Sequence, residues 1–144
     1  MTEAPVVAAA RLWLGTPYLH QASARGAGCD CLGLIRGVWR EVHGQEPAPI
    51  PPYTPDWSEP QGAETLWETA ARLLPPGQGG EGDLLLFRMR AGSPAKHLGI
   101  QSGPAAFIHS MSGHGVLESP LSAPWAARIV ARFDLARPAS TGAA

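Results

Sequence analysis

The chain has 144 residues, of which 44% are hydrophobic, and its formal net charge at pH 7 is −1. This length allows one domain with its own core, and the nearly neutral charge gives no reason to expect binding to nucleic acid. No apolar stretch approaches the roughly 20 residues that a membrane-spanning helix needs, so we expect no membrane insertion. The two cysteines are separated by one residue, too close for a disulfide framework, and we expect free thiols.

The first predicted element is a short helix over residues 4–14. Pro5 suits the first helical position, and Gly15 and Pro17 end the pattern. We expect a turn at residues 15–18 and a loop over residues 19–27. The apolar face of the helix would consist of Val6, Val7, Ala10, Leu12 and Leu14.

The stretch from Gly28 to Ile35 places Cys31 where a loop becomes a helix. Apolar residues recur after Cys31 at helical spacing, which predicts a helix that ends at His43 before a C-capping Gly44. Asp30 can cap the first turn. The positive end of a helix lowers the pKa of a thiol, so we interpret Cys31 as a nucleophile. On its own, Cys31 could equally be a small core residue.

The rest of the chain predicts an extended connection, a helix and a run of strands. Six prolines exclude a helix or a central strand from residues 45–62, where Tyr53 and Trp57 are expected to pack on the core. Helical spacing resumes over residues 63–74. The pattern then changes to short apolar runs that predict strands at 84–88, 97–101, 106–110, 115–118 and 128–133.

This order of elements predicts an α+β fold, with N-terminal helices packed on an antiparallel β-sheet meander. We expect a single domain over residues 1–137 and a frayed C-terminal tail over residues 138–144.

A nucleophilic thiol needs a base and a third group that orients the base. His97 begins a predicted strand, and His109 lies twelve residues later on the next one, so a hairpin can bring the two rings side by side. Cys31, His97 and His109 are therefore the predicted thiol, base and orienting group. The other three histidines are expected in a loop, at a helix end and in a turn, respectively His20, His43 and His114.

Four motifs resemble, in order, those of the NlpC/P60 family of cell-wall cysteine peptidases. The similarity covers about residues 5–133, and residues 30–41 are especially similar to the phage and gene-transfer-agent branch. The motifs are Gly28-Cys29-Asp30-Cys31-Leu32-Gly33-Leu34, Gly82-Asp83-Leu84-Leu85-Leu86-Phe87, His97-Leu98-Gly99-Ile100 and Phe107-Ile108-His109-Ser110.

The resemblance implies a papain-like fold, with Cys31 as the nucleophile, His97 as the base and His109 as the residue that orients His97. It also implies that Tyr18 lies near the oxyanion site and that Asp30 grips the amino end of a stem peptide. No cofactor and no metal are implied. The chain departs from the family pattern at Leu32, where many relatives carry serine, and at Leu19-His20-Gln21, which replaces tryptophan-glycine. Those departures concern substrate subsites.

By the same resemblance the protein would be a peptidoglycan hydrolase, a cysteine endopeptidase that cleaves stem peptides at the γ-D-glutamyl–diamino acid bond. The N-terminal residues lack the basic flank of a secretory signal, so we expect synthesis in the cytoplasm without a signal peptide. Together with the branch resemblance, this favours a phage-tail or gene-transfer-agent particle that carries the protein to the cell wall. Its expected partners are then stem peptides and tail proteins.

Three alternatives stay open at this point. The same thiol and histidine could serve a papain-like amidase or acyltransferase. Cys29 and Cys31 with the two histidines could hold a structural zinc ion, although a one-residue spacing is unlike that of common zinc knuckles. The chain could also be a tail-structural protein with a decayed site. Cys29 itself has no assigned partner, and we expect it to be a packed loop residue.

Overall fold

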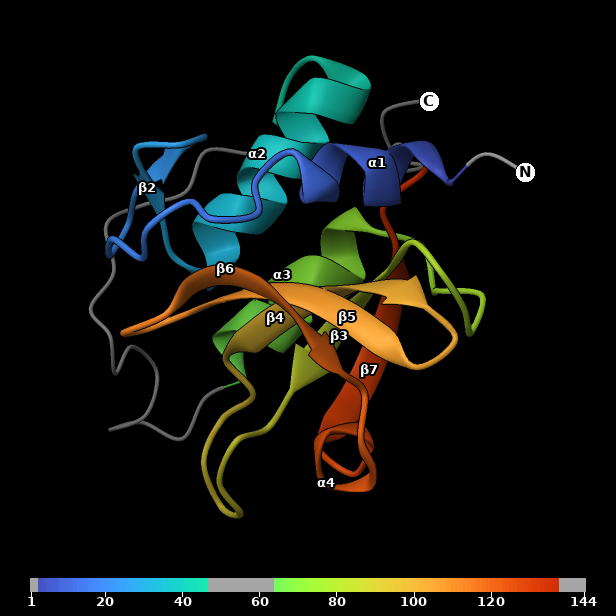
Figure 1. The fold of residues 1–144 in the computed structure, drawn as a ribbon. Coiled ribbons are helices and arrows are strands. Elements are labelled where there is room, and N and C mark those ends of the chain that lie inside the picture. Colours follow the sequence, from blue (N-terminus) through green and yellow to red (C-terminus); the bar gives the residue numbers. More distant parts are fainter. Residues whose placement is uncertain (1–2, 47–63, 138–144) are drawn as a thin grey trace.

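A five-stranded antiparallel sheet with helices on both faces forms the centre of the computed structural model (Figure 1). The structure describes residues 3–46 and 64–137. Its helices are α1 (Pro5–Arg11), α2 (Cys31–His43), α3 (Thr65–Leu73) and α4 (Ala123–Ala126). The strands of the large sheet are β3 (Asp83–Phe87), β4 (His97–Gly103), β5 (Ala106–Met111), β6 (Gly115–Pro120) and β7 (Ile129–Asp134). This arrangement confirms the predicted α+β fold.

The strand order is β6-β5-β4-β3-β7. Strands β3 to β6 form the expected meander, but β7 does not follow β6. After β6 the chain passes through α4 and pairs β7 antiparallel with β3 at the other edge of the meander. All five residues of β3 are buried, which explains its continuous apolar run.

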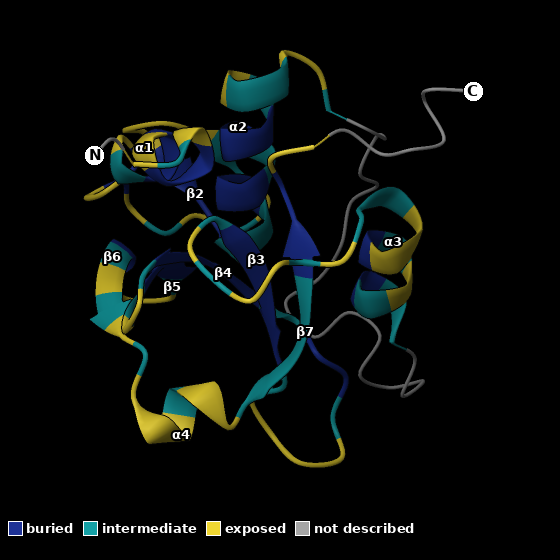
Figure 2. Ribbon diagram, turned by 90° about the vertical axis from the view of Figure 1, so that its right-hand side faces the viewer, coloured by how far each residue is buried: buried dark blue, intermediate teal, exposed yellow. Residues whose placement is uncertain are grey.

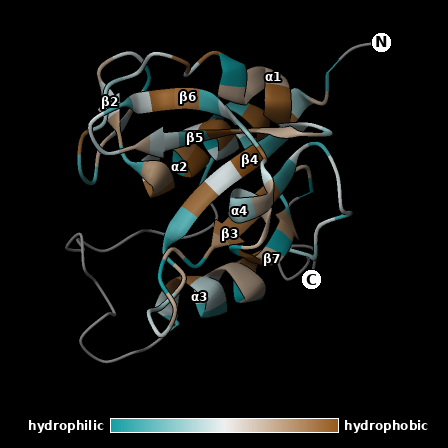
Figure 3. Cartoon of the chain, turned by 60° about the horizontal axis from the view of Figure 1, so that its bottom comes forward, coloured by the Kyte–Doolittle hydropathy of each residue, from teal (hydrophilic) through white to brown (hydrophobic). Residues whose placement is uncertain are grey.

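The two faces of the sheet carry different cores. One face packs against α1, α2 and α3, whose buried side chains include Val6, Leu34 and Leu66. The other face carries a smaller cluster of Leu85, Phe87 and Phe107, with α4 packed against it. In Figure 2 the buried parts of α1 and α2 lie on one side of the central strands and the largely exposed α4 on the other. Figure 3 shows hydrophobic residues alternating with less hydrophobic ones along β4. Leu98 and Ile100 belong to the larger core, so the residues on either side of them face the side of the sheet that carries α4.

Helix α2 has the predicted bounds, because both of its ends are capped as expected. The side chain of Asp30 accepts a hydrogen bond from the Gly33 N–H at 2.7 Å. At the other end Gly44 has a φ of 90° and donates its N–H to the Arg40 carbonyl oxygen.

Two local predictions were wrong in part. Helix α1 ends at Arg11, not at residue 14, and Leu12 and Leu14 are exposed instead of extending the apolar face. The stretch predicted as a loop over residues 19–27 contains β1 (Ser23–Ala24), which pairs antiparallel with β2 (Gly28–Cys29).

Helix α3 lies within its predicted range. The proline-rich connection from residue 47 onward, including Tyr53 and Trp57, and the tail from residue 138 lie outside the described residues. Among the helices that are described, none has the length and apolar character needed to cross a membrane.

Candidate active site

The start of α2 is fixed by the carboxylate of Asp30, which is 2% exposed. One carboxylate oxygen accepts the Gly33 N–H at 2.7 Å, and the other accepts the Gln21 N–H at 2.8 Å. Gln21 has a φ of 64°, a conformation that costs free energy for a residue with a side chain, and its bond to Asp30 offsets that cost. Asp30 therefore has the predicted capping role and also joins the preceding loop to the helix.

Tyr18 reaches the site because its backbone runs beside β2. Tyr18 forms a parallel bridge with Cys29, the Leu19 N–H donates to the Cys29 carbonyl oxygen at 3.1 Å, and the Cys29 N–H donates to the Pro17 carbonyl oxygen at 3.0 Å. Burial raises the pKa of Tyr18 to about 12, and the nearby Cys31 and Asp30 act in the same direction. The phenol is therefore protonated at neutral pH and available as a hydrogen-bond donor.

The thiol of Cys31 stands at the first position of α2 and donates a hydrogen bond to the Lys96 carbonyl oxygen, with a sulfur-to-oxygen distance of 3.5 Å. Burial and the negative charge of Asp30 raise the pKa of Cys31 to about 12. Backbone N–H groups at the helix start and at Leu98 act in the opposite direction but do not outweigh them. The helix start thus acts on the thiol in the predicted direction, but burial and Asp30 outweigh it in this structure.

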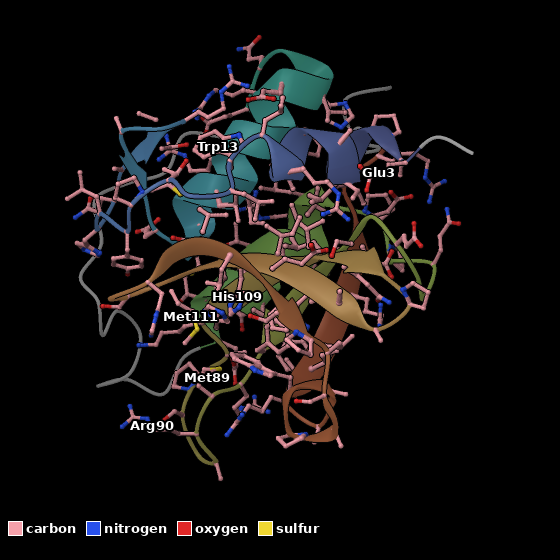
Figure 4. The ribbon with its side chains drawn as sticks, viewed as in Figure 1. Glu3, Trp13, Met89, Arg90, His109 and Met111 are labelled. Carbon is pink, nitrogen blue, oxygen red and sulfur yellow. The ribbon has the colours of Figure 1, made fainter. Side chains whose placement is uncertain are left out.

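His97 and His109 lie side by side, as the hairpin predicted. His97 Nε2 lies 2.8 Å from His109 Nδ1, and the two rings are nearly perpendicular with centroids 5.0 Å apart. His109 is fully buried, and its Nε2 lies 2.9 Å from Ser119 Oγ of β6. Figure 4 shows His109 in the middle of the sheet, whereas Arg90 extends outward from the loop before β4. His97, His109 and Ser119 thus form a continuous polar row across β4, β5 and β6.

Gly99 makes room for this row. Ile100 pairs with Ile108, so Gly99 stands between His97 and Gln101 on the face of the sheet that carries His109. A Cβ atom on Gly99 would approach Phe107 Cδ2 to 2.9 Å and the Ile108 carbonyl oxygen to 3.2 Å. The absence of a side chain at Gly99 therefore lets the two histidines meet diagonally across neighbouring strands.

Aromatic rings pack against the histidine pair. The Trp125 ring lies 5.8 Å from that of His97 and 5.2 Å from that of His109, and Phe87 lies 5.6 Å from His97. Burial lowers the pKa of His97 to about 4. Burial and the neighbouring His97 lower the pKa of His109 to about 3. Both rings are therefore neutral at pH 7, as their predicted roles of base and neutral orienting group require.

The backbone next to His97 contacts the thiol of Cys31. Lys96, whose carbonyl oxygen accepts the thiol hydrogen, directly precedes His97. No hydrogen bond joins Cys31 to His97 in the part of the chain that the structure describes. Because His97 Nε2 is taken by His109, Nδ1 is the nitrogen left for the thiol.

Cys29 lies beneath the site and takes no part in the row. It is fully buried, as expected, although in β2 instead of a loop, and its carbonyl oxygen accepts a hydrogen bond from Ser110 Oγ at 2.9 Å. Across residues 3–46 and 64–137, no three histidine, cysteine, aspartate or glutamate side chains form a group that could hold a metal ion. Of the remaining histidines, His43 ends α2 with its Nε2 2.7 Å from the Leu135 carbonyl oxygen, and His20 Nδ1 lies 3.7 Å from Asp30.

The sequence reasoning missed two residues that complete the site, Ser119 and Trp125. Ser119 pairs with Phe107 in the β5–β6 register, which places it on the same face as His109. Strand alternation could have placed Ser119 there only once that register was known. Trp125 lies on the four-residue α4, too short to leave a periodic pattern.

The fold and the site together define a papain-like α+β domain with a cysteine at a helix start and a pair of hydrogen-bonded histidines on the sheet. The family model described as NlpC/P60 matches residues 15–133, from the turn after α1 to β7. The chain belongs to the NlpC/P60 family.

Two named bacterial proteins show the relationship. The chain is 30% identical over 113 residues to "Murein DD-endopeptidase MepS/Murein LD-carboxypeptidase" of Escherichia coli K12, which covers 78% of this chain and 52% of that protein. It is 28% identical over 135 residues to "Gamma-DL-glutamyl hydrolase" of Bacillus subtilis 168, which covers 92% of this chain and 30% of that protein. The chain thus spans about half the length of the first relative and less than a third of the second.

Solved structures share the fold. The NlpC/p60 domain of the peptidoglycan hydrolase SagA is 27% identical with a TM-score of 0.61, and the match covers 93% of this chain and 99% of that domain. An NlpC/P60 family protein from Bacillus cereus ATCC 10987 is 22% identical with a TM-score of 0.65, covering 95% of this chain and 42% of that one.

The first prediction concerns the reactivity of Cys31. Because only the thiolate reacts with iodoacetamide, we expect slow alkylation of Cys31 at pH 7 and a rate that rises about tenfold per pH unit up to at least pH 9. Mass spectrometry of the alkylated peptide measures this rate, and Cys31→Ala gives the background from the buried Cys29. A rate that is already high and constant below pH 7 would show that the thiol is ionised at rest.

The second prediction concerns acid stability. The folded pKa values of His97 and His109, about 4 and about 3, lie below the ordinary value of 6.5, so the unfolded chain binds more protons between these limits. Stability is then fully present above pH 6.5 and falls as the pH drops toward 4, by a Tm shift on the order of 15 °C between pH 7 and 4.5.

Thermal unfolding of the wild type and of His109→Asn measures this effect. The variant should show a flatter Tm profile in that window, whatever its absolute stability. Identical slopes in the two proteins would contradict a neutral, buried His109.

Proposed function

We propose that this chain is a peptidoglycan hydrolase, a cysteine endopeptidase that cleaves stem peptides. The observation that carries the proposal is a thiol at the start of α2, beside the backbone of a histidine whose ring is held by a second, buried histidine. The names of relatives support the substrate, because they include a murein endopeptidase and a peptidoglycan hydrolase.

In the proposed reaction, Cys31 leaves the Lys96 carbonyl oxygen and transfers its proton to Nδ1 of His97. The sulfur then attacks the carbonyl carbon of the scissile amide. His97 returns the proton to the leaving amine, and a water molecule that His97 deprotonates releases the acyl group from sulfur. Because thiol and imidazole are both neutral at rest, the ion pair forms only when the substrate is in place.

Hydrogen bonds at the helix start and from Tyr18 would stabilise the oxyanion. The backbone N–H groups of Cys31 and Leu32 lie close enough to the thiol to lower its pKa, so they lie close to where the carbonyl oxygen would bind. The protonated phenol of Tyr18 is a further donor. His109 keeps His97 in place without adding a negative charge.

For the scissile bond we propose the γ-D-glutamyl–diamino acid linkage. The Bacillus relative is named a gamma-DL-glutamyl hydrolase, which supports a γ-glutamyl bond, whereas the E. coli relative is named for DD-endopeptidase and LD-carboxypeptidase activities. Asp30 would attract the free amino end of the stem peptide. Since both of its oxygens accept backbone N–H groups and it is 2% exposed, it would act mainly through its charge.

The third prediction tests the nucleophile. We expect Cys31→Ala to lower the activity on purified sacculi at least a thousandfold with no change in fold, because the residue forms the covalent intermediate. Dye release from labelled sacculi measures activity, and circular dichroism checks the fold. Cys29→Ser serves as the matched control, since it alters a thiol outside the row, and should retain cleavage. Undiminished cleavage by Cys31→Ala would refute the mechanism.

Mass spectrometry of defined muropeptide digests identifies the bond and separates the alternatives. Hydrolysis adds water across the γ-D-glutamyl bond, whereas an acyltransferase would give a product carrying an added amine. Absence of any product with the wild type would favour a decayed structural protein.

We further propose that a phage tail or gene-transfer-agent particle delivers the enzyme to the cell wall. This proposal rests on the resemblance to that branch that we inferred from residues 30–41 of the sequence. The fourth prediction is that the protein co-sediments with tail-containing particles and that particles carrying Cys31→Ala assemble but penetrate the wall poorly. Sedimentation with immunoblotting measures the association. A protein found only outside the particles would contradict this route.

A further inference from the structure

Ser119 of β6 continues the polar row that begins at His97. Its Oγ lies 2.9 Å from His109 Nε2, while the other ring nitrogen of His109 faces His97. In the described residues these two side chains are the hydrogen-bond partners of the His109 ring. Ser119 is half-buried and lies outside the four motifs that carried the family resemblance.

The position of the hydrogens along this row decides whether His97 can act as a base. Neutral His97 can accept the thiol proton on Nδ1 only if its own hydrogen is on Nε2. That Nε2–H must donate to a lone pair on His109 Nδ1. His109 then carries its hydrogen on Nε2, in a fully buried position where an unmet N–H group is costly. Ser119 Oγ accepts this hydrogen.

The opposite arrangement would disable the base. A serine hydroxyl can also donate, so Ser119 could donate to His109 Nε2 and His109 Nδ1–H could donate to His97 Nε2. The hydrogen of neutral His97 would then be on Nδ1, with no lone pair left for the thiol. Once His97 is protonated, both of its nitrogens carry hydrogens, and His109 Nδ1 must again accept. The reacting state is therefore compatible only with the arrangement in which Ser119 accepts.

We propose that Ser119 is a positioning residue that holds His109 in the Nε2–H tautomer and thereby keeps Nδ1 of His97 free to take the proton from Cys31. Ser119 acts through the two histidines, without touching the substrate. This inference rests on the proposed hydrolase function for its kinetic consequence, but the tautomer itself is a property of the folded protein.

The test compares Ser119→Ala and Ser119→Thr with Ser102→Ala as the matched control. Ser102 Oγ on β4 donates to Glu118 Oε2 at 2.6 Å, so its removal deletes a hydroxyl from the same sheet without touching a histidine. Nitrogen NMR of ¹⁵N-histidine-labelled protein reports which nitrogen of His109 carries the hydrogen. Muropeptide hydrolysis gives kcat and KM separately.

We expect the wild type, Ser119→Thr and Ser102→Ala to show the Nε2–H tautomer of His109. Ser119→Ala should show a mixture of tautomers, with a kcat lower by about tenfold, the factor that corresponds to one hydrogen bond, and an unchanged KM. Recovery of kcat in Ser119→Thr would show that the lower kcat of Ser119→Ala comes from the missing hydroxyl and not from altered packing.

A wild-type His109 that carries its hydrogen on Nδ1 would overturn the inference, as would an unchanged tautomer and kcat in Ser119→Ala. If the wild-type protein hydrolyses no muropeptide, the proposed function fails, while the tautomers of the wild type and Ser119→Ala still decide whether Ser119 sets the state of His109.

Discussion

The buried carboxylate of Asp30 is the interaction on which the site depends. It caps α2 through the Gly33 N–H and holds the preceding loop through the Gln21 N–H. The loop is tied to the same helix a second time, because Ser23 Oγ donates to the Gly33 carbonyl oxygen and Arg40 donates to the Ser23 carbonyl oxygen. This double attachment helps to fix the loop before Cys31 relative to the helix that carries the thiol.

The same carboxylate also contributes to the chemical state of the thiol. Burial is the main cause that favours the thiol over the thiolate at Cys31, and the negative charge of Asp30, one residue earlier, acts in the same direction. The backbone N–H groups at the helix start favour the thiolate but are outweighed. The surroundings that place Cys31 therefore also make its thiol hard to ionise at rest. A neutral thiol beside a neutral imidazole also reacts slowly with stray electrophiles and oxidants.

Local patterns were enough to predict the helix that carries Cys31, the five strands and the pair of histidines. Both ends of α2 are encoded in single residues, Asp30 and Gly44, and the histidines lie on consecutive strands of a short hairpin. The features that were missed depend on distant partners. The pairing of β7 with β3 is set by packing across the whole sheet, and the short β1 exists only because it pairs with β2. The pKa of Cys31 depends on its burial, which periodicity does not report.

The register of the strands brings the polar residues of the site together. His97, Gly99 and His109 lie on one face, and Ser119 joins them there through the pairing of β6 with β5. Because side chains alternate between faces, a slip of one residue in either pairing would send a histidine or the serine to the opposite core. The apolar residues between them, Leu98 and Ile108, are buried against the helices and oppose such a slip. The hydrophobic alternation that stabilises the sheet thus also aligns the hydrogen-bonded row of His97, His109 and Ser119.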